Sequence, residues 1–437
     1  MTTTTLIASR ADPASVTSQF DSESALRFIT CGSVDDGKST LIGRLLVDSR
    51  SVLQDQLAGV QRGGAPDLAL LTDGLAAERE QGITIDVAWR YFATARRKFI
   101  IGDAPGHEQY TRNMVTAASG ADAAVVLVDA TKLDVAAADI ALLAQTRRHA
   151  LLAALLRVPS LVFAVNKLDA VPDAASAFAR IRAALQAFAQ EAGLAVRAIV
   201  PISALQGWNV VEPRADWCDY RGPSLLALLE DLPVAAAPVD EPFALPVQWV
   251  EKPSAQTEIA QGRRVFWGRV AAGAVAPGQA VTVLPGGQSA TVMQVLDHVR
   301  QGGSGRAGAS VGLVLDRELD ISRGDWLLAP GAHPPAREIE ATVAWLDDEP
   351  LTAQRVYWAL HGHRWVKARV THIAHRLNVD TLAEEEASEL APNAIGHVTL
   401  ALQEPLAVRP YTASRALGAL VLVDTATHRT AAAVLVR

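Results

Sequence analysis

A glycine-rich loop between an apolar run and a helical segment constrains the fold of this chain more than any other feature. Residues Gly32–Ser39 read Gly-Ser-Val-Asp-Asp-Gly-Lys-Ser and fit the pattern G-x-x-x-x-G-K-[S/T]. The preceding Leu26–Cys31 has the composition of a short buried strand, and Thr40–Leu46 follows with helical spacing. A strand, loop and helix in this order place backbone N–H groups at a helix N-terminus, which favours anions. The context therefore predicts a polyphosphate-binding loop rather than a chance match.

The residue types within this loop suit a nucleotide with a bound magnesium ion. Lys38 would reach the β- and γ-phosphates, and the Ser39 hydroxyl would ligate Mg²⁺. The residues expected to contact the nucleotide here are Gly32, Ser33, Val34, Asp35, Asp36, Gly37, Lys38, Ser39 and Thr40.

A second motif, Asn166-Lys167-Leu168-Asp169, predicts which base is bound. Guanine presents N1–H and an exocyclic NH₂ side by side, and the Asp169 carboxylate can accept from both, whereas adenine offers no such donor pair. Four residues alone are a weak match, but the apolar run Ser160–Val165 precedes them as a buried strand would. Ser203, Ala204 and Leu205 follow another apolar run and are expected to close over the base with backbone N–H groups. The two motifs together predict GTP binding and hydrolysis.

The segment Phe99–His107 carries residues suited to sensing the γ-phosphate. Asp103 would hold Mg²⁺ through water, Pro105 and Gly106 would lie against the phosphates, and the Gly106 N–H would lose its contact after hydrolysis. His107 stands where a residue could orient the attacking water, although an ordinary loop histidine is the alternative.

Upstream, Glu78–Asp86 offers Thr84, whose hydroxyl and carbonyl would grip Mg²⁺ and the γ-phosphate only in the GTP state. The stretch 48–82 is then expected to be a loop ordered by the nucleotide. Val34 and Ile83 would form an apolar gate that holds His107 away from water until it is triggered.

Apolar runs alternate with Ala- and Leu-rich helical stretches between residues 25 and 235, which predicts an α/β domain with a mostly parallel sheet and helices on both faces. The expected strands are Leu26–Cys31, Val87–Phe92, Lys98–Asp103, Ala123–Asp129, Ser160–Asn166 and Val196–Ile202.

Prolines between residues 233 and 246 mark a change of composition, after which short β-type runs are separated by Gly and Pro turns. We expect two small β-barrel domains over 236–332 and 333–437, after a P-loop GTPase domain over 25–235 and a disordered tail over 1–24.

The overall composition fits a multidomain protein outside the membrane. The chain has 437 residues, a formal net charge of −7 and two cysteines, which provide no disulfide framework. The acidic balance argues weakly against broad nucleic-acid binding. Because the start has neither a basic region nor a long apolar region, and no apolar run reaches the length of a membrane span, we expect a cytoplasmic protein.

The motifs together resemble the translational GTPase superfamily around elongation factor Tu. Longer strings resemble one branch, the GTPase subunit of bacterial ATP sulfurylase (sulfate adenylyltransferase). These strings are Gly32–Leu46, Asp67–Leu71, Asp73–Val87, His107–Met114, Gln145–His149 and Asp320–Asp325.

This resemblance implies an energy-coupling role. The family's GTPase subunit works with a small catalytic subunit, which binds ATP and sulfate and makes adenosine 5′-phosphosulfate and pyrophosphate, and GTP hydrolysis drives that uphill step. A heterodimer or a higher assembly of heterodimers is implied, without stable nucleic-acid binding. Two alternatives are an elongation-factor-like GTPase that delivers an RNA ligand and a GTP-regulated scaffold with degraded hydrolysis.

Three features depart from the family pattern or stand outside it. Ala104 replaces the usual Thr, and extra Ala-rich residues lie between Asp129 and Gln145. There Thr131–Asp134 imitates the guanine motif, but no strand leads directly into it as one does into Asn166. A basic and aromatic cluster with histidines spans 358–376. Since this run holds no acid or thiol to complete a metal site, surface strand and turn residues are the favoured interpretation, and Glu384–Glu386 is expected to be a solvated turn.

Overall fold

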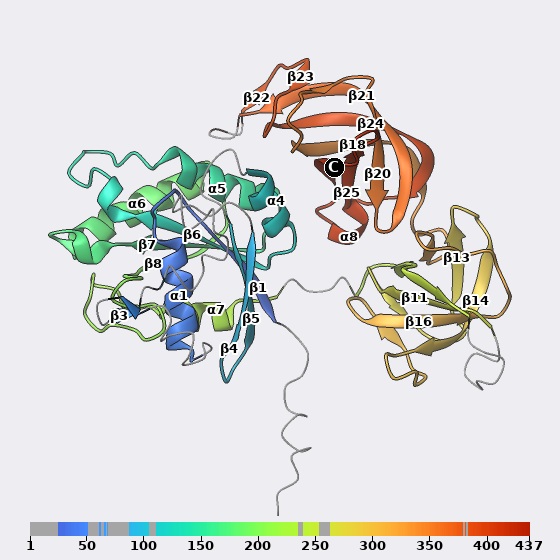
Figure 1. Ribbon diagram of the computed structural model, residues 1–437, viewed down its shortest axis with the longest axis horizontal. Coiled ribbons are helices and arrows are strands. Elements are labelled where there is room, and N and C mark those ends of the chain that lie inside the picture. The colour runs from blue at the N-terminus through green and yellow to red at the C-terminus, as the bar shows by residue number, and fades with distance from the viewer. Residues whose placement is uncertain are drawn as a thin grey trace, which may run out of the picture.

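The computed structural model describes residues 25–50, 61–62, 65–66, 68, 87–104, 111–234, 239–252, 263–378, 381 and 383–437. The expected disordered tail over residues 1–24 lies outside these ranges. Figure 1 shows an α/β unit followed by two β-rich units along the chain.

The first unit is built on a six-stranded sheet in the order β4-β5-β1-β6-β7-β8. β4 runs antiparallel to β5 and the other neighbours are parallel, so the predicted mostly parallel sheet is confirmed. Every strand lies within a residue or two of its predicted position. The bounds are β1 Leu26–Cys31, β4 Ala88–Ala93, β5 Lys98–Asp103, β6 Ala123–Asp129, β7 Ser160–Asn166 and β8 Val196–Pro201.

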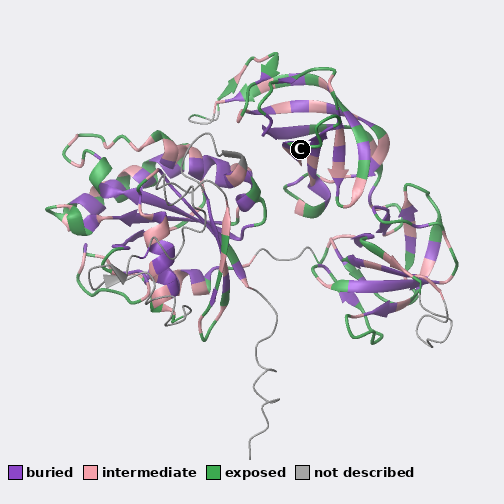
Figure 2. Cartoon of the chain, in the orientation of Figure 1, coloured by how far each residue is buried: buried purple, intermediate pink, exposed green. Residues whose placement is uncertain are grey.

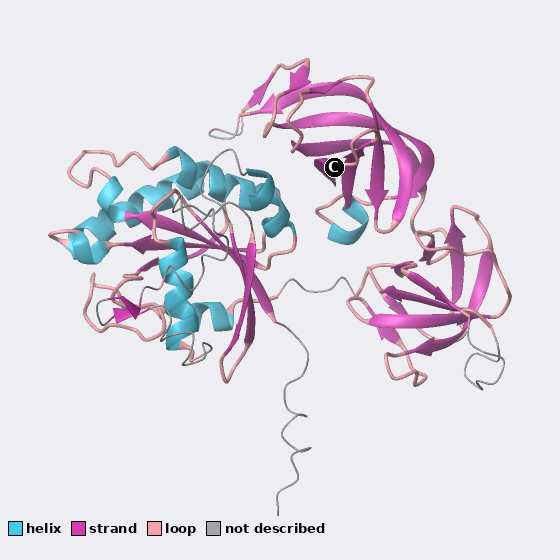
Figure 3. Ribbon diagram, viewed as in Figure 1, coloured by secondary structure: helices cyan, strands magenta, loops and turns pink. Residues whose placement is uncertain are grey.

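Helices cover both faces of this sheet (Figure 3). Every residue of β6 and β7 is buried, because successive side chains of a central strand enter apolar clusters on opposite faces. Over the ranges given above, no helix has the length and apolar character needed to cross a membrane. The helices are α1 Lys38–Asp48, α4 Thr111–Ser119, α5 Ala144–Leu155, α6 Ala174–Glu191 and α7 Leu225–Asp231, with 3₁₀ turns η4 Ala130–Lys132 and η5 Leu168–Ala170, and a strand pair β2 Gln61–Arg62 and β3 Ala65–Pro66.

The second unit is an antiparallel sheet of seven strands in the order β10-β11-β16-β14-β13-β17-β9. Ala244 on β9 exchanges backbone hydrogen bonds with Ala272, just beyond β11, so the sheet curls back on itself. The bounds are β9 Ala244–Pro246, β10 Trp249–Glu251, β11 Val265–Arg269, β13 Ala280–Leu284, β14 Ser289–Leu296, β16 Ser310–Leu315 and β17 Trp326–Leu328, with a separate pair β12 Ala274–Val275 and β15 Gly305–Arg306.

The third unit is a closed barrel, since β20 pairs with β21 as well as with β25 and joins the two ends of the sheet β20-β25-β26-β18-β24-β21. The Ala-rich run of β26 has little strand character of its own. The expectation of a solvated turn at Glu384–Glu386 was wrong, because Glu384 and Glu385 form strand β22. The bounds are β18 Pro335–Trp345, β20 Val356–His361, β21 Arg364–Leu377, β22 Glu384–Glu385, β24 Ile395–Ala407, β25 Ala419–Asp424 and β26 Thr430–Val436, with a pair β19 Leu351–Thr352 and β23 Glu389–Leu390, and a short helix α8 Arg415–Gly418.

The third unit packs directly on the first. The Tyr411 hydroxyl donates to the carbonyl oxygen of Leu156 at 3.2 Å, and Arg415 donates to the carbonyl oxygens of Ala121, at 3.2 Å, and Arg157. Leu377 also belongs to the apolar cluster on one face of the parallel sheet. This interface lies at the edge of the parallel sheet where β6 begins. The opposite edge is the one where the parallel strands end. Figure 2 colours these elements by burial.

The contacts between the two β-rich units include an aromatic pair, ion pairs and a shared apolar cluster, and Arg409 pairs with Glu241 at 3.3 Å. The Trp326 ring stacks on the His361 ring with centroids 4.9 Å apart, and Arg364 pairs with Asp325 at 2.8 Å. Both Trp326 and His361 are buried, so the stack excludes water from this junction.

The interface between the first and third units predicts a specific effect of Tyr411→Phe. The change leaves the Leu156 carbonyl without its hydroxyl donor in a buried place, so we expect a loss of about 1–3 kcal/mol in the free energy of unfolding. Urea unfolding followed by fluorescence measures it. Tyr91→Phe is the matched control because Tyr91 is 69% exposed, and an equal loss in both variants would contradict the role of this hydrogen bond.

Candidate functional site

The motif residues predicted from the sequence gather at one edge of the parallel sheet. β1, β5 and β7 run parallel and end at Cys31, Asp103 and Asn166, which brings the loop after β1 beside the other two residues. In open α/β sheets this carboxyl edge is where ligands bind. The fold thereby places the phosphate loop, the magnesium candidate and the base motif on one side of the molecule.

Two glycines give the phosphate loop its shape. Gly37, just before α1, has φ of 91°, and a Cβ there would lie 2.5 Å from Nδ2 of Asn166. Gly32 has φ of 152°, and a Cβ there would lie 2.9 Å from the carbonyl oxygen of Leu127. Both positions therefore combine a left-handed backbone with a close approach, which only glycine tolerates.

Lys38 lies inside this loop with its ammonium group held by backbone oxygens. Its Nζ donates to the carbonyl oxygens of Ser33 at 2.8 Å and Gly32 at 3.2 Å. Burial lowers the pKa of Lys38, while Asp103 and Asp36 act to raise it. Ser33 Oγ is buried and has no hydrogen-bond partner among the described residues. A buried cation and a spare hydroxyl at the start of α1 fit an anionic phosphate group.

Asp103 is oriented by its neighbour in the sheet. Thr30 and Asp103 are paired across β1 and β5, and the Thr30 hydroxyl donates to Asp103 Oδ1 at 3.2 Å. Ala104 is fully buried and its N–H donates to the Thr30 carbonyl oxygen at 3.1 Å, a backbone contact that the missing Thr side chain does not alter. Together with Ser39 at the second position of α1, this carboxylate is a donor set of hard oxygens that fits Mg²⁺.

The side chain of Asn166 ties two loops together. Its Nδ2 donates to the Asp36 carbonyl oxygen at 2.8 Å, and its Oδ1 accepts from the Ala204 N–H at 2.9 Å. Arg44 of α1 donates to the Ala204 carbonyl oxygen at 3.2 Å and so supports the same loop. Asp169, three residues further along the chain on η5, is exposed and available for recognition of the base.

Two lysines and a buried carboxylate brace the outer side of the phosphate loop. Lys132 pairs with Asp36 Oδ1 at 2.8 Å and donates to the Val34 carbonyl oxygen. Lys167 donates to the Asp35 carbonyl oxygen at 2.6 Å and pairs with Asp129 at 2.8 Å. Burial raises the pKa of Asp36, against the lowering effect of Lys132. Burial also acts to raise the pKa of Asp129, but Lys167 and Thr131 outweigh it and lower that pKa.

Lys132 is the functional residue that sequence reasoning missed. The string Thr131–Asp134 was interpreted as an imitation of the guanine motif because no strand leads directly into it, and in the structure β6 ends at Asp129 with Ala130 of η4 before Thr131, whereas β7 runs through Asn166. The parallel order β7-β6-β1 in the sheet puts the residue after β6 beside the loop after β1. The signal available in the sequence was the predicted strand end at Asp129, which places Lys132 at the same edge of the sheet as the phosphate loop. The Ala-rich stretch that follows does not extend a helix, because α5 begins only at Ala144.

Several predicted site residues cannot be placed. Thr84, Pro105, Gly106 and His107, together with Ile83 of the expected gate, lie outside the described residues. Their roles stay predictions.

Comparison with known proteins identifies the family. The model of the elongation factor Tu GTP-binding domain matches residues 23–297, and the model of the eEF1A-like C-terminal domain matches residues 338–437. Sulfate adenylyltransferase subunit 1 of Laribacter hongkongensis is 45% identical, over 95% of this chain and 86% of that protein. The chain belongs to the sulfate adenylyltransferase subunit 1 family.

Other members of this family show the same relation. Sulfate adenylyltransferase subunit 1 of Citrobacter koseri is 43% identical over 95% of this chain and 86% of its own length. The bifunctional enzyme CysN/CysC of Xylella fastidiosa is 46% identical over 93% of this chain, which spans 65% of that longer protein. The GTP-binding domain and the expected fold are thus confirmed for a GTP-binding member of this family.

The brace on the phosphate loop predicts that Lys132→Met weakens nucleotide binding. The change leaves the Asp36 carboxylate fully buried without its cation, so the loop loosens and GDP affinity falls by about tenfold, which equals about 1.4 kcal/mol. Fluorescent GDP titration measures the affinity. Lys98→Met is the control because Lys98 is an exposed lysine on β5, and equal affinity in all three proteins would refute the brace.

Proposed function

We propose that this chain is the GTP-binding and GTP-hydrolysing subunit of sulfate adenylyltransferase. It would couple hydrolysis of GTP to the formation of adenosine 5′-phosphosulfate and pyrophosphate from ATP and sulfate. The observation that carries this proposal is the 43–45% identity to proteins named sulfate adenylyltransferase subunit 1, over 86% of their length. No feature of the described residues favours the alternative of an RNA-delivering factor.

GTP and Mg²⁺ would be held by the residues at the carboxyl edge of the sheet. Lys38 and the N–H groups of the phosphate loop would bind the β- and γ-phosphates, and Asp169 would bind the guanine edge. Ser39, Asp103 and Thr84 would hold Mg²⁺. When bound, the ion neutralises phosphate charge during phosphoryl transfer. Because Asn166 joins the phosphate loop to residues 203–205, phosphate and base recognition would act on one rigid frame.

Hydrolysis would be sensed by the segment that precedes α4. Gly106 would donate its N–H to the γ-phosphate, and His107 would orient the attacking water. α4 begins at Thr111, directly after this segment, and Arg415 of the third unit donates to the carbonyl oxygen of Ala121, just beyond the end of α4. A movement of α4 on loss of the γ-phosphate would therefore be transmitted to the third unit through a short path of packed atoms.

The name subunit 1 in the relatives implies that a second subunit exists in this family. We infer that its partner is the small subunit that binds ATP and sulfate, in a heterodimer or an assembly of heterodimers. We also propose that the domains divide at residues 235 and 332, as the sequence predicts.

The guanine specificity predicts a reversal with Asp169→Asn. Xanthine carries a carbonyl oxygen at the position where guanine carries its NH₂ group. The amide introduced by this change can donate a hydrogen bond to that oxygen, which the Asp169 carboxylate cannot do. We therefore expect GTP affinity to fall by about a hundredfold or more and xanthosine triphosphate affinity to rise. Competition titrations against a fluorescent nucleotide measure both. Asp173→Asn, an acidic residue nearby at the start of α6, is the control, and loss of both nucleotides equally would count against a role in base recognition.

Energy coupling predicts a GTP-dependent gain in sulfate activation. The chain is mixed with the small subunit encoded beside it, and pyrophosphate release from ATP and sulfate is measured with and without GTP. We expect strong stimulation by GTP that Lys38→Ala abolishes, because the variant loses the phosphate-binding cation, whereas the surface variant Lys98→Ala keeps it. A formed complex with intact GTP hydrolysis but no stimulation would overturn the coupling role.

A further inference from the structure

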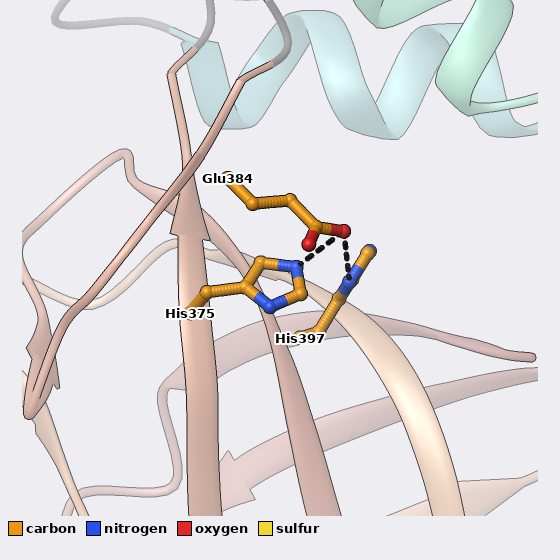
Figure 4. A group of neighbouring side chains, drawn as sticks. All are labelled: His375, Glu384 and His397. Atoms are coloured by element: carbon orange, nitrogen blue, oxygen red, sulfur yellow. Dashed lines mark ion pairs between the residues drawn. The ribbon is translucent and has the colours of Figure 1, made fainter.

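Two histidines and a glutamate lie close together on one face of the barrel in the third unit. Nε2 of His375 lies 3.1 Å from Oε1 of Glu384, and Nδ1 of His397 lies 3.9 Å from the same oxygen. The ring centroids of His375 and His397 are 4.3 Å apart. Figure 4 shows the carboxylate facing both rings, with each residue on a different strand. The potential ligand atoms all lie within 4.8 Å of one another.

Strand pairing puts these side chains together. His375 on β21 is directly opposite His397 on β24, and β22 adds Glu384 from the other edge of β21, opposite Leu377. The neighbouring Glu385 fixes the register of β22, since it accepts from Arg376 at 2.5 Å and 3.1 Å and from Asn378 at 2.9 Å. The Glu384 carboxylate is therefore aimed at the histidines by the sheet itself.

The contact with Arg437 shows which ring nitrogen of His397 carries the electron pair. Arg437 Nη1 lies 2.7 Å from His397 Nδ1, and a guanidinium can only donate, so Nδ1 is the acceptor. Nε2 of His375 is a buried atom without a hydrogen-bond partner among the described residues, and Oε1 of Glu384 lies beside it at 3.1 Å.

We propose that His375, Glu384 and His397 form a binding site for a divalent transition-metal ion of the zinc type. Two imidazoles and one carboxylate are a common donor set for zinc sites that keep an open position. Bond lengths of about 2.0–2.2 Å put tetrahedral ligand atoms about 3.4 Å apart, so the three ligand atoms would draw together around an ion. The cluster is open to solvent on the side of Glu384, whose side chain is 61% exposed. The sequence did not reveal this site, because the histidine-rich run 358–376 contains no acidic residue. The acidic residue, Glu384, lies on the next strand, β22.

Arg437 is the one described group that opposes the ion. Its guanidinium occupies the electron pair that the metal needs on His397, so binding requires that this exposed side chain swing away. The Arg437 backbone stays in place, because its N–H donates to the Glu340 carbonyl oxygen at 2.9 Å. The ion, once bound, would join β21, β22 and β24 next to Leu377 and Ile395, which pack into the apolar cluster of the first unit.

Titration of the nucleotide-free full chain with Zn²⁺ by calorimetry tests this site. We expect one ion per chain with micromolar or tighter affinity, and a loss of about tenfold or more in each of His375→Ala, His397→Ala and Glu384→Gln. Arg437→Gln should tighten binding, because it removes the competing cation and keeps the fold. Absorption of bound Co²⁺ in the visible range reports the same site independently of heat.

Control variants separate this site from incidental binding. His372→Ala changes an exposed histidine on the same strand and should leave affinity unchanged. Circular dichroism and thermal melts of every variant check that the barrel stays folded, and only folded variants are compared. The proposal is overturned if wild type shows no saturable binding, if the three ligand variants bind like wild type, or if His372→Ala weakens binding as much as they do.

Discussion

The rest of the site depends on two hydrogen bonds made by the carboxamide group of Asn166. Asn166 is 2% exposed at the end of a fully buried strand, and it satisfies the Asp36 carbonyl oxygen and the Ala204 N–H at once. Loss of either bond would leave a buried backbone group unpaired, at about 1–3 kcal/mol each. One side chain thus joins three segments that are far apart in the sequence, and it also requires glycine at position 37, where any Cβ would collide with it.

Charged side chains also support this loop. Lys132 and Lys167 donate hydrogen bonds to carbonyl oxygens on the outer side of the loop between β1 and α1, and Asp129 pairs with Lys167. Lys38 occupies the inner side. Asp36 is fully buried, and Lys132 and the Ser33 N–H stabilise its carboxylate. These contacts hold the loop between β1 and α1 in its shape.

The same fold connects the site to the barrels. The strands of the parallel sheet end at its carboxyl edge, where the candidate site lies. The third unit contacts the opposite edge of that sheet near Ala121 and Leu156. α4 and α5 run between the two edges against one apolar cluster, which also includes Leu377 and Ile395 of the barrel. Closely packed clusters move as units rather than deform, which gives a physical route from the phosphate loop to a distant surface.

The sequence by itself determined the parallel sheet, the phosphate loop, the base motif and the two β-rich units, because each depends on local patterns: apolar runs, loop glycines and the spacing of prolines. The alanines of strand β26 carry little strand signal of their own, and they become a strand only by pairing with β18 and β25. Tertiary structure alone decided that Lys132 meets Asp36 and that Glu384 meets His375 and His397. These contacts join residues that lie on, or directly follow, different strands, and the order and register of strands in a sheet are set by the packing of the whole domain rather than by any short stretch of sequence.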